Sequence, residues 1–320
     1  MQFLKYFCLF WTGTLLGSSE RQTKNIINTY IAAYIIPAAY AIFQVLKSGS
    51  LEYMATGTLG EHHSSLGTNM HIPLFLLTGM MLKDKNAGLS RIILTVFFFS
   101  ALVMAQSRAA LGSFLIALPA LIFLKIRFKV ILKAAAWFSA IILLFYFSGL
   151  FQAIFDLTFR SRYGLKIDLS SYSRLIIWQS ALNFFIEAPI IQKIIGCGPG
   201  AFSQNVFFEY NFWSDKIISG GHNNFIHVLV ETGIFGLLAF MFFWSSIILR
   251  SAFISRSEVN RTALYLLTVS LFISCIGQDT LWMLTWHGYL LPAYFLLLGL
   301  FSGKSDLTNS VHSPGKISSS

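Results

Sequence analysis

The stretch IILTVFFFSALVMAQSRAALGSFLIALPALIFL, residues 92–124, decides the fold that the sequence predicts. As one helix its 33 residues would reach about 50 Å, which is too long for one crossing of a hydrocarbon core of about 30 Å and too short for two. We interpret the stretch as a helical hairpin that turns at Ser107 and Arg108. A hairpin puts the basic loops before and after it on one side of a membrane, whereas a single crossing would separate them.

The composition is that of a membrane protein. Of 320 residues, 55% are hydrophobic and 11% charged, a balance that a soluble domain cannot hide behind a polar surface. We therefore predict an all-α polytopic transmembrane helical bundle with about nine spans and one long outward-facing loop containing amphipathic helices. The N-terminal apolar run is counted as a retained span because no small-residue cleavage site stands out. The predicted spans are residues 1–17, 26–46, 67–82, 92–106, 109–124, 130–148, 223–249, 262–278 and 281–301.

The positive charge is a topology signal. The formal charge is +10, but the basic residues lie in short loops between apolar spans, which argues against a nucleic-acid partner. With the hairpin, 14 of the 23 Lys and Arg residues fall on one side and 3 in short segments on the other, so the first side is predicted to be cytoplasmic. The three cysteines have no metal-ligand spacing, and we predict no disulfide framework.

The predicted topology divides the chain into four parts. Residues 1–148 are N-terminal transmembrane helices, 149–222 a long outer loop, 223–302 C-terminal transmembrane helices, and 303–320 a disordered cytoplasmic tail. The turn at Arg108 and the loop at Glu61-His62-His63 fall on the same outer side as the long loop.

A surface helix is predicted within the long loop. Ser173 is a suitable cap for a helix that runs to Pro189. An apolar stripe at helical spacing indicates that this helix lies on the membrane surface. The stripe consists of Leu175, Trp178, Leu182 and Phe185.

The segment GGHNNFIHVLVETGIFG, residues 220–236, holds the most distinctive polar pattern. His222 and Asn223 stand at the mouth of a predicted span, and Gly233 and Gly236 follow one helical turn apart. An asparagine cap with two glycines that permit close helix packing would explain the pattern without catalysis. Spacing alone leaves this structural interpretation and a catalytic one open.

The pattern resembles a known signature. His-Asn, nine residues, then Gly-x-x-Gly is similar to the signature of O-antigen ligases, with related forms in O-antigen polymerases and protein O-oligosaccharyltransferases. Ser107-Arg108-Ala109 resembles the earlier arginine motif of the family, and Ser173-Arg174 with Trp178 and Pro189 resembles the stretch before the histidine. The stretch 196–202 belongs to the same resemblance, which is best from about 106 to 240.

The resemblance implies transfer of a glycan from undecaprenyl diphosphate to an acceptor hydroxyl on the periplasmic side of the bacterial cell inner membrane, in lipopolysaccharide or other polysaccharide biosynthesis. The implied partners are an undecaprenyl-diphosphate-linked donor, a lipid, glycan or protein acceptor, and the membrane. The implied glycosyltransferase uses no cofactor and no metal ion, and direct attack inverts the anomeric centre.

The resemblance also implies catalytic roles. Arg108 and Arg174 would hold the diphosphate in bidentate geometry, and Arg174 would add the positive end of its helix by lying in the first turn. His222 would accept or orient the proton of the attacking hydroxyl. Without the resemblance, Arg108 reads as a lipid-headgroup contact and Arg174 as part of a solvated helix face.

The substrate-binding candidates are Asn223, Trp178, Arg160 and Arg162, and either of these two arginines is an alternative to Arg174 as phosphate ligand.

Other polar residues are given structural roles. We expect His227 to be a packing residue and Glu231 to be the partner of a buried polar group. Adjacent His62 and His63 point in different directions, so a mouth for acceptor or carrier is favoured there over a metal site. The glycines of the segment 196–200 are expected to form a turn, because no lysine and no strand–helix unit supports a nucleotide cradle.

Three questions stay open from the sequence. Ligase, polymerase and protein O-oligosaccharyltransferase differ chiefly in the acceptor, which the residues do not identify. A transporter or flippase of a polyprenyl-linked saccharide is the second interpretation, but such a protein would place charges near midplane on broken helices. A membrane scaffold without activity is the third.

Overall fold

The computed structural model describes residues 2–50, 53–59, 62–83, 88–124, 169–202, 221–253, 258–278 and 290–302. All regular secondary structure in these ranges is helical, as predicted. The predicted span 130–148, the residues Glu61, Arg160 and Arg162, and the tail 303–320 lie outside the described residues. The helices are α1 (Gln2–Leu16), α2 (Glu20–Ser48), α3 (His63–Asn69), α4 (His71–Lys83), α5 (Leu89–Met104), α6 (Arg108–Ala117), the 3-10 helix η1 (Leu118–Leu124), α9 (Leu169–Glu187), α10 (Ile190–Ile195), α12 (Asn224–Ser251), α13 (Glu258–Ser274) and α14 (Leu290–Ser302).

The predicted hairpin is confirmed by the break between α5 and α6. The chain leaves the helix after Met104, and Gln106 adopts a φ of 49°, which no α-helix continues. Ser107 then caps α6 by accepting a hydrogen bond from the Ala110 amide on its side-chain oxygen. A polar turn with a capping serine therefore divides the apolar stretch in two.

Two described helices, α2 and α12, are long and apolar enough to cross a membrane by length and composition. The shorter apolar helices of the described chain have 10 to 17 residues, including η1 with α6. The count of about nine spans stays a prediction.

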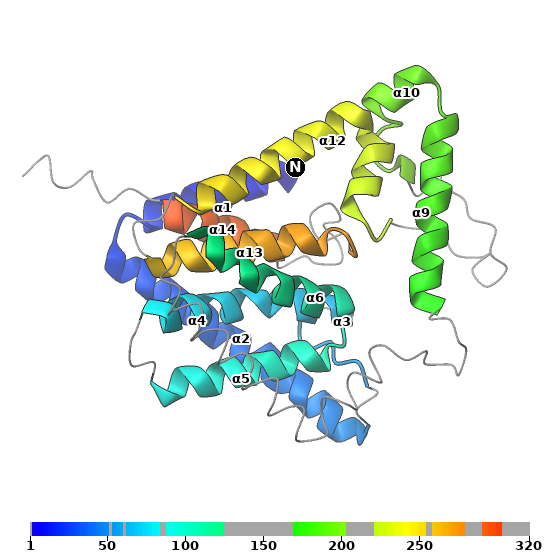
Figure 1. Ribbon diagram of the computed structural model, residues 1–320. Helices are drawn as coiled ribbons and strands as arrows, with labels where there is room; N and C mark the ends of the chain where they lie inside the picture. Colours follow the sequence, from blue (N-terminus) through cyan, green and yellow to red (C-terminus); the bar gives the residue numbers. More distant parts are fainter. Residues whose placement is uncertain are drawn as a thin grey trace, which may run out of the picture.

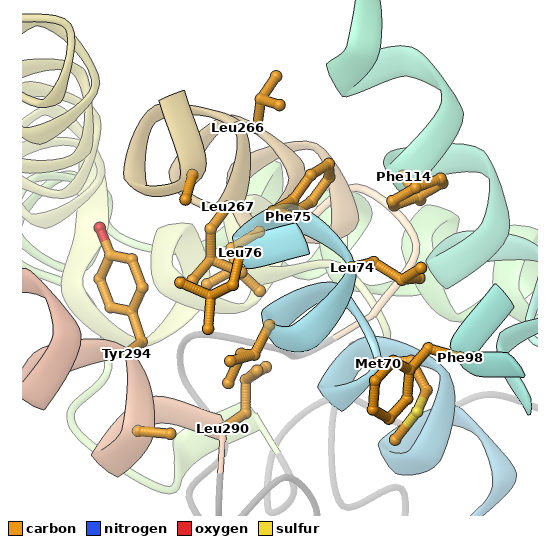
Figure 2. Packing of buried hydrophobic residues seen from close by; sticks show 14 of the residues in the cluster. Met70, Leu74, Phe75, Leu76, Phe98, Phe114, Leu266, Leu267, Leu290 and Tyr294 are labelled. Carbon is orange, nitrogen blue, oxygen red and sulfur yellow. The ribbon is translucent and has the colours of Figure 1, made fainter. Parts of the chain in front are cut away.

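The main core lies between α4, α13, α6, α5 and α14, and α1 packs along α14 (Figure 1). Figure 2 shows that large apolar side chains from these helices meet in its interior. Phe75 stacks on Phe114 with ring centroids 4.9 Å apart, which joins α4 to α6. For helices that lie in lipid, as predicted for these, close van der Waals packing of such rings is a main stabilising term.

Helix α12 is bent sharply at Gly233, which has a φ of 68° and a ψ of −168°. The rings of Phe225 and Phe240 lie 5.9 Å apart, although a straight helix would separate these positions by roughly 22 Å. The two halves of α12 therefore form a V. The expectation that residues 223–249 form one regular span is therefore wrong. For the same reason, the positions of His227 and Glu231 in a membrane do not follow from the rise of a straight helix.

A second, smaller core lies outside the bundle. It contains Ile177 and Ala181 of α9, Phe202, and Val230 of the first half of α12. Helix α9 runs crosswise to α5 and α13 at one end of the bundle (Figure 1). Because α12 is bent, its first half packs on α9 and its second half packs along the main bundle.

Two expectations for α9 are wrong. The helix begins at Leu169, so Ser173 lies inside it and Arg174 lies in the second turn, away from the positive end. The predicted apolar stripe stays a prediction, with Leu175 and Leu182 exposed and Trp178 partly buried. Periodicity found the helix but placed its first residue five positions late, at Arg174 in place of Leu169.

Candidate functional site

The candidate site lies at the end of the bundle where several polar loops meet, which we call the polar end. It is made of residues 53–59, 62–63, 104–108, 221–224 and 275–278. The Ala55 amide donates to the Met104 carbonyl, and the Asn224 amide donates to the Cys275 carbonyl at 2.9 Å. The predicted meeting of the Arg108 turn with the loop before His63 is therefore found in the structure.

Arg108 is the first residue of α6. Its neighbour Ser107 also accepts a hydrogen bond from the side-chain amide of Gln278, with 2.8 Å between Nε2 and Oγ. The start of α6 is thereby attached to the turn after α13. Arg108 is partly buried, and the positive end of the helix that it begins is a favourable place for an anion.

Arg174 extends from α9 to the same turn. Its Nη1 donates to the Gly277 carbonyl at 3.2 Å. This carbonyl follows the C-terminus of α13, where the helix dipole attracts a cation. This bond orients the guanidinium group, whose planar shape suits bidentate binding of an anion.

His222 has an unusual backbone. Its φ is 48°, in the left-handed region, and its side chain is exposed. Among the described non-glycine residues this conformation occurs at Gln106 and His222, and both residues lie in the polar end. Histidine tolerates the left-handed region better than most residues, but the conformation still costs free energy.

Asn223 is the N-cap of α12. Its Oδ1 accepts hydrogen bonds from the amides of Phe225 and Ile226 at 3.0 and 3.2 Å. The structural interpretation of this asparagine is thus correct, and its carbonyl oxygen is committed to the helix. The side-chain NH₂ is the group that remains suited to a substrate contact.

Trp178 is fixed by its indole N–H, which donates to the Gly221 carbonyl at 2.7 Å. This bond ties α9 to the residue that precedes His222. The ring, and not the N–H, is then the part of Trp178 that suits a sugar face.

The glycine segment 196–200 packs on the bend of α12. The amides of Cys197 and Gly198 donate to the carbonyls of Val230 and Glu231, which the break at Gly233 frees from helical bonding. A Cβ on Gly233 would lie 2.4 Å from the Ile194 carbonyl oxygen, so only glycine fits there. The expectation that these glycines form a turn is confirmed.

The Glu231 carboxylate also forms hydrogen bonds with the glycine segment and with Phe202. Its Oε1 accepts from the Gly200 amide at 2.8 Å and the Phe202 amide at 3.4 Å, and lies 3.2 Å from His227 Nε2. The His227 ring stacks on Phe202 with centroids 4.8 Å apart. Both expectations, Glu231 as a polar partner and His227 as a packing residue, agree with these contacts.

Histidines of α3 and α4 form hydrogen bonds with backbone carbonyls of the hairpin turn and of the start of α6. His63 Nδ1 lies 2.8 Å from the Ala105 carbonyl, and His71 Nε2 lies 2.9 Å from the Ala110 carbonyl. Because a carbonyl only accepts, each of these nitrogens carries the proton. His71 also meets Ser270 of α13 through Nδ1. Sequence reasoning missed His71, since a lone histidine in an apolar span carries no pattern.

The structure gathers Arg108, Arg174, Trp178, His222 and Asn223 around the polar end, whereas Arg160 and Arg162 lie outside the described residues. The described ranges contain no group of three His, Cys, Asp or Glu side chains placed to hold a metal ion. Gln278 and Gly277, which attach both arginine segments, were missed because they stood at the end of a predicted span without a motif.

The part of the chain that the structure describes is all-helical, contains two helices long and apolar enough to cross a membrane, and has a polar site at one end of the bundle. The family model described as O-Antigen ligase matches residues 93–241, so this part of the chain is similar to O-antigen ligases. The resemblance of the motifs is confirmed, and members of the family are enzymes that transfer glycans in polysaccharide assembly. No curated protein matches the chain.

Proposed function

We propose that the protein transfers a glycan from undecaprenyl diphosphate to an acceptor hydroxyl on the periplasmic side of the inner membrane. One observation carries the proposal. The start of α6 at Arg108, the Arg174 side chain and the start of α12 beside His222 are all attached to residues 275–278. Two cations and an imidazole thus share one support at one end of the bundle.

The arginines suit a diphosphate leaving group. Guanidinium groups bind phosphate oxygens in bidentate geometry and stabilise the charge that grows as the glycosidic C–O bond breaks. Arg108 lies at the positive end of α6, so the helix dipole would also attract the diphosphate there. The sequence had predicted this contribution for the helix of Arg174. Arg174 is oriented by the Gly277 carbonyl.

His222 suits the acceptor. Its imidazole accepts the proton of the attacking hydroxyl, whose oxygen forms a bond to the anomeric carbon while the lipid diphosphate leaves. Such direct attack inverts the anomeric centre and uses no metal ion. The exposed side chain and strained backbone of His222 fit a residue that is held toward a ligand.

Trp178, Asn223, Arg160 and Arg162 are the proposed substrate-binding residues. The acceptor is lipid A-core, a growing glycan or a protein, and these correspond to ligase, polymerase and protein O-oligosaccharyltransferase activities. The division at residues 148, 222 and 302, the periplasmic loop and the cytoplasmic tail are part of the same proposal.

The test is glycan transfer in proteoliposomes supplied with an undecaprenyl-diphosphate-linked glycan and, in turn, the three acceptor classes. We expect the wild type to transfer to one class and His222→Ala to lose transfer while it still binds undecaprenyl diphosphate. Cys8→Ser, an exposed change on α1, is the matched control and should transfer normally. Full transfer by His222→Ala would contradict the role of the imidazole.

A transporter or flippase of a polyprenyl-linked saccharide is the second candidate, because α12 is broken at Gly233 as transporter helices often are. The polar groups at this break favour transfer instead. Glu231 is occupied by the Gly200 and Phe202 amides and by His227, and its segment packs on α9. Movement of labelled donor between leaflets without transfer to any acceptor would favour transport.

A further inference from the structure

The turn after α13, residues 275–278, lies outside the motifs and outside the matched domain 93–241, yet it contacts residues of both. Its amides at Cys275, Ile276 and Gly277 bond three residues back, to Phe272, Ile273 and Ser274, so the helix ends in a tight turn. Its carbonyls at Cys275 and Gly277 then serve the Asn224 amide and the Arg174 guanidinium.

Gln278 completes this turn with a buried side chain, of which only 5% is exposed. Its Nε2 donates to Ser107 Oγ at 2.8 Å, and its Oε1 accepts from Thr68 Oγ1 at 3.2 Å. Both ends of the buried amide are therefore bonded to protein groups. The three elements that it joins are α3, the start of α6 and the end of α13.

The two arginine supports are adjacent in the chain. Gly277 orients Arg174 through its carbonyl, and Gln278 holds the cap of the helix that begins at Arg108. Gly277 also lies against α6, since a Cβ built on it would be 3.1 Å from the Ala109 Cβ. A rigid two-residue link thus sets the position of α6 relative to Arg174.

We infer that Gln278 is a positioning residue that fixes the spacing of Arg108 and Arg174 for the diphosphate of the lipid donor. This inference rests on the proposed function. The amide does not touch the donor, and its effect is on how well two guanidinium groups reach one diphosphate at once. The spacing matters because bidentate recognition tolerates small displacements poorly.

The test is binding of undecaprenyl diphosphate to purified full-length protein in detergent, with the melting temperature of each variant measured in parallel. Gln278→Leu keeps the shape and removes both hydrogen bonds. We expect it to weaken binding about tenfold and to raise the KM for donor, with the KM for acceptor unchanged. Ser107→Ala should weaken binding similarly, and Ser107→Thr, which keeps the hydroxyl, should restore it.

Thr268→Val is the matched control. It removes the buried side-chain hydrogen bond between Thr268 Oγ1 of α13 and Tyr294 Oη, which are 2.9 Å apart, two turns of the helix away from residues 275–278. We expect a lower melting temperature with unchanged binding. The double variant Gln278→Leu with Ser107→Ala should weaken binding by less than the product of the two single effects, because both variants remove the shared Gln278–Ser107 bond.

Wild-type affinity in a folded Gln278→Leu protein would overturn the inference and leave the proposed function standing. If Gln278→Leu does not fold, the Ser107→Ala and Ser107→Thr pair decides: equal wild-type affinity in both overturns the inference, and weakened binding restored by threonine supports it. Absence of binding by the wild type overturns the proposed function, and this inference with it.

Discussion

At the scale of single residues, the candidate site combines strain with fixed hydrogen bonds. His222 and Gln106 hold left-handed backbone conformations that L residues avoid, and Ser107 and Asn223 next to them cap the helices that follow. A strained backbone conformation persists when hydrogen bonds of neighbouring residues fix it. The capping hydrogen bonds of Ser107 and Asn223 have this role here.

His222→Gly separates the fold from the chemistry. Glycine accepts a φ of 48° without strain, and this relief of about 1 kcal/mol offsets the greater entropy of glycine in the unfolded chain. We expect thermal stability near that of the wild type with transfer abolished. Scanning fluorimetry and the proteoliposome assay measure the two effects. A glycine variant that retains transfer would show that the imidazole is not needed.

Cys197 reports on the glycine segment through its thiol. Partial burial raises the pKa of the Cys197 thiol above its ordinary value of 9.0, so the folded protein resists formation of the thiolate. Its stabilising contribution is present below the ordinary pKa and is lost as pH rises through the raised value. We expect maleimide to label Cys197 more slowly in folded than in unfolded protein near pH 9, followed by mass spectrometry. Equal rates in both states would contradict the burial.

At the scale of elements, the V of α12 is the feature that builds the site. The break at Gly233 frees two carbonyls, the 196–200 turn occupies them, and Glu231 holds the turn from the other side. The first half of α12 can therefore pack with α9 in the second core and present His222 at the polar end.

Gly233→Ala tests the V. A Cβ at this position meets the Ile194 carbonyl and a backbone that glycine alone adopts easily, so we expect a loss of about 1–3 kcal/mol of stability and faster labelling of Cys197. Gly112→Ala is the matched control in α6, where nothing lies within 4 Å of the added methyl group. It should raise stability by about 0.5–1 kcal/mol. A neutral Gly233→Ala variant would be inconsistent with the bend.

At the scale of the whole molecule, the helices run between two chemically different ends. The polar end gathers the candidate site, whereas Arg91, Arg250 and Arg261 lie at the opposite ends of α5, α12 and α13. This division agrees with the loops that the charge count grouped together. The positive-inside rule then predicts that the end with these arginines is cytoplasmic.

Cysteine accessibility tests the orientation. In a Cys8→Ser, Cys197→Ser background, where the remaining Cys275 is buried, Ser50→Cys and Ser90→Cys place one exposed thiol at each end. We expect a membrane-impermeant maleimide added to spheroplasts to label Ser50→Cys and to spare Ser90→Cys until the membrane is broken. The reverse pattern would invert the topology and remove the periplasmic site.

The sequence by itself determined what depends on local pattern. It identified the helical class from apolar content, the hairpin from length and charge, the similarity to O-antigen ligases from short motifs, and the turn at 196–200 from glycine content. Each of these features depends on residue composition or on residues close together in the chain. Tertiary contacts are therefore not needed to recognise it.

Only the tertiary structure decided what depends on residues far apart in the chain. The V of α12, the start of α9, the cap at Ser107 bonded to Gln278, and the attachment of Arg174 to Gly277 all require partners from other elements. A backbone carbonyl or a glutamine at the end of a span carries no motif. Its role appears only when the fold brings a donor or an acceptor beside it, because hydrogen bonds act over a few ångströms and not along the sequence.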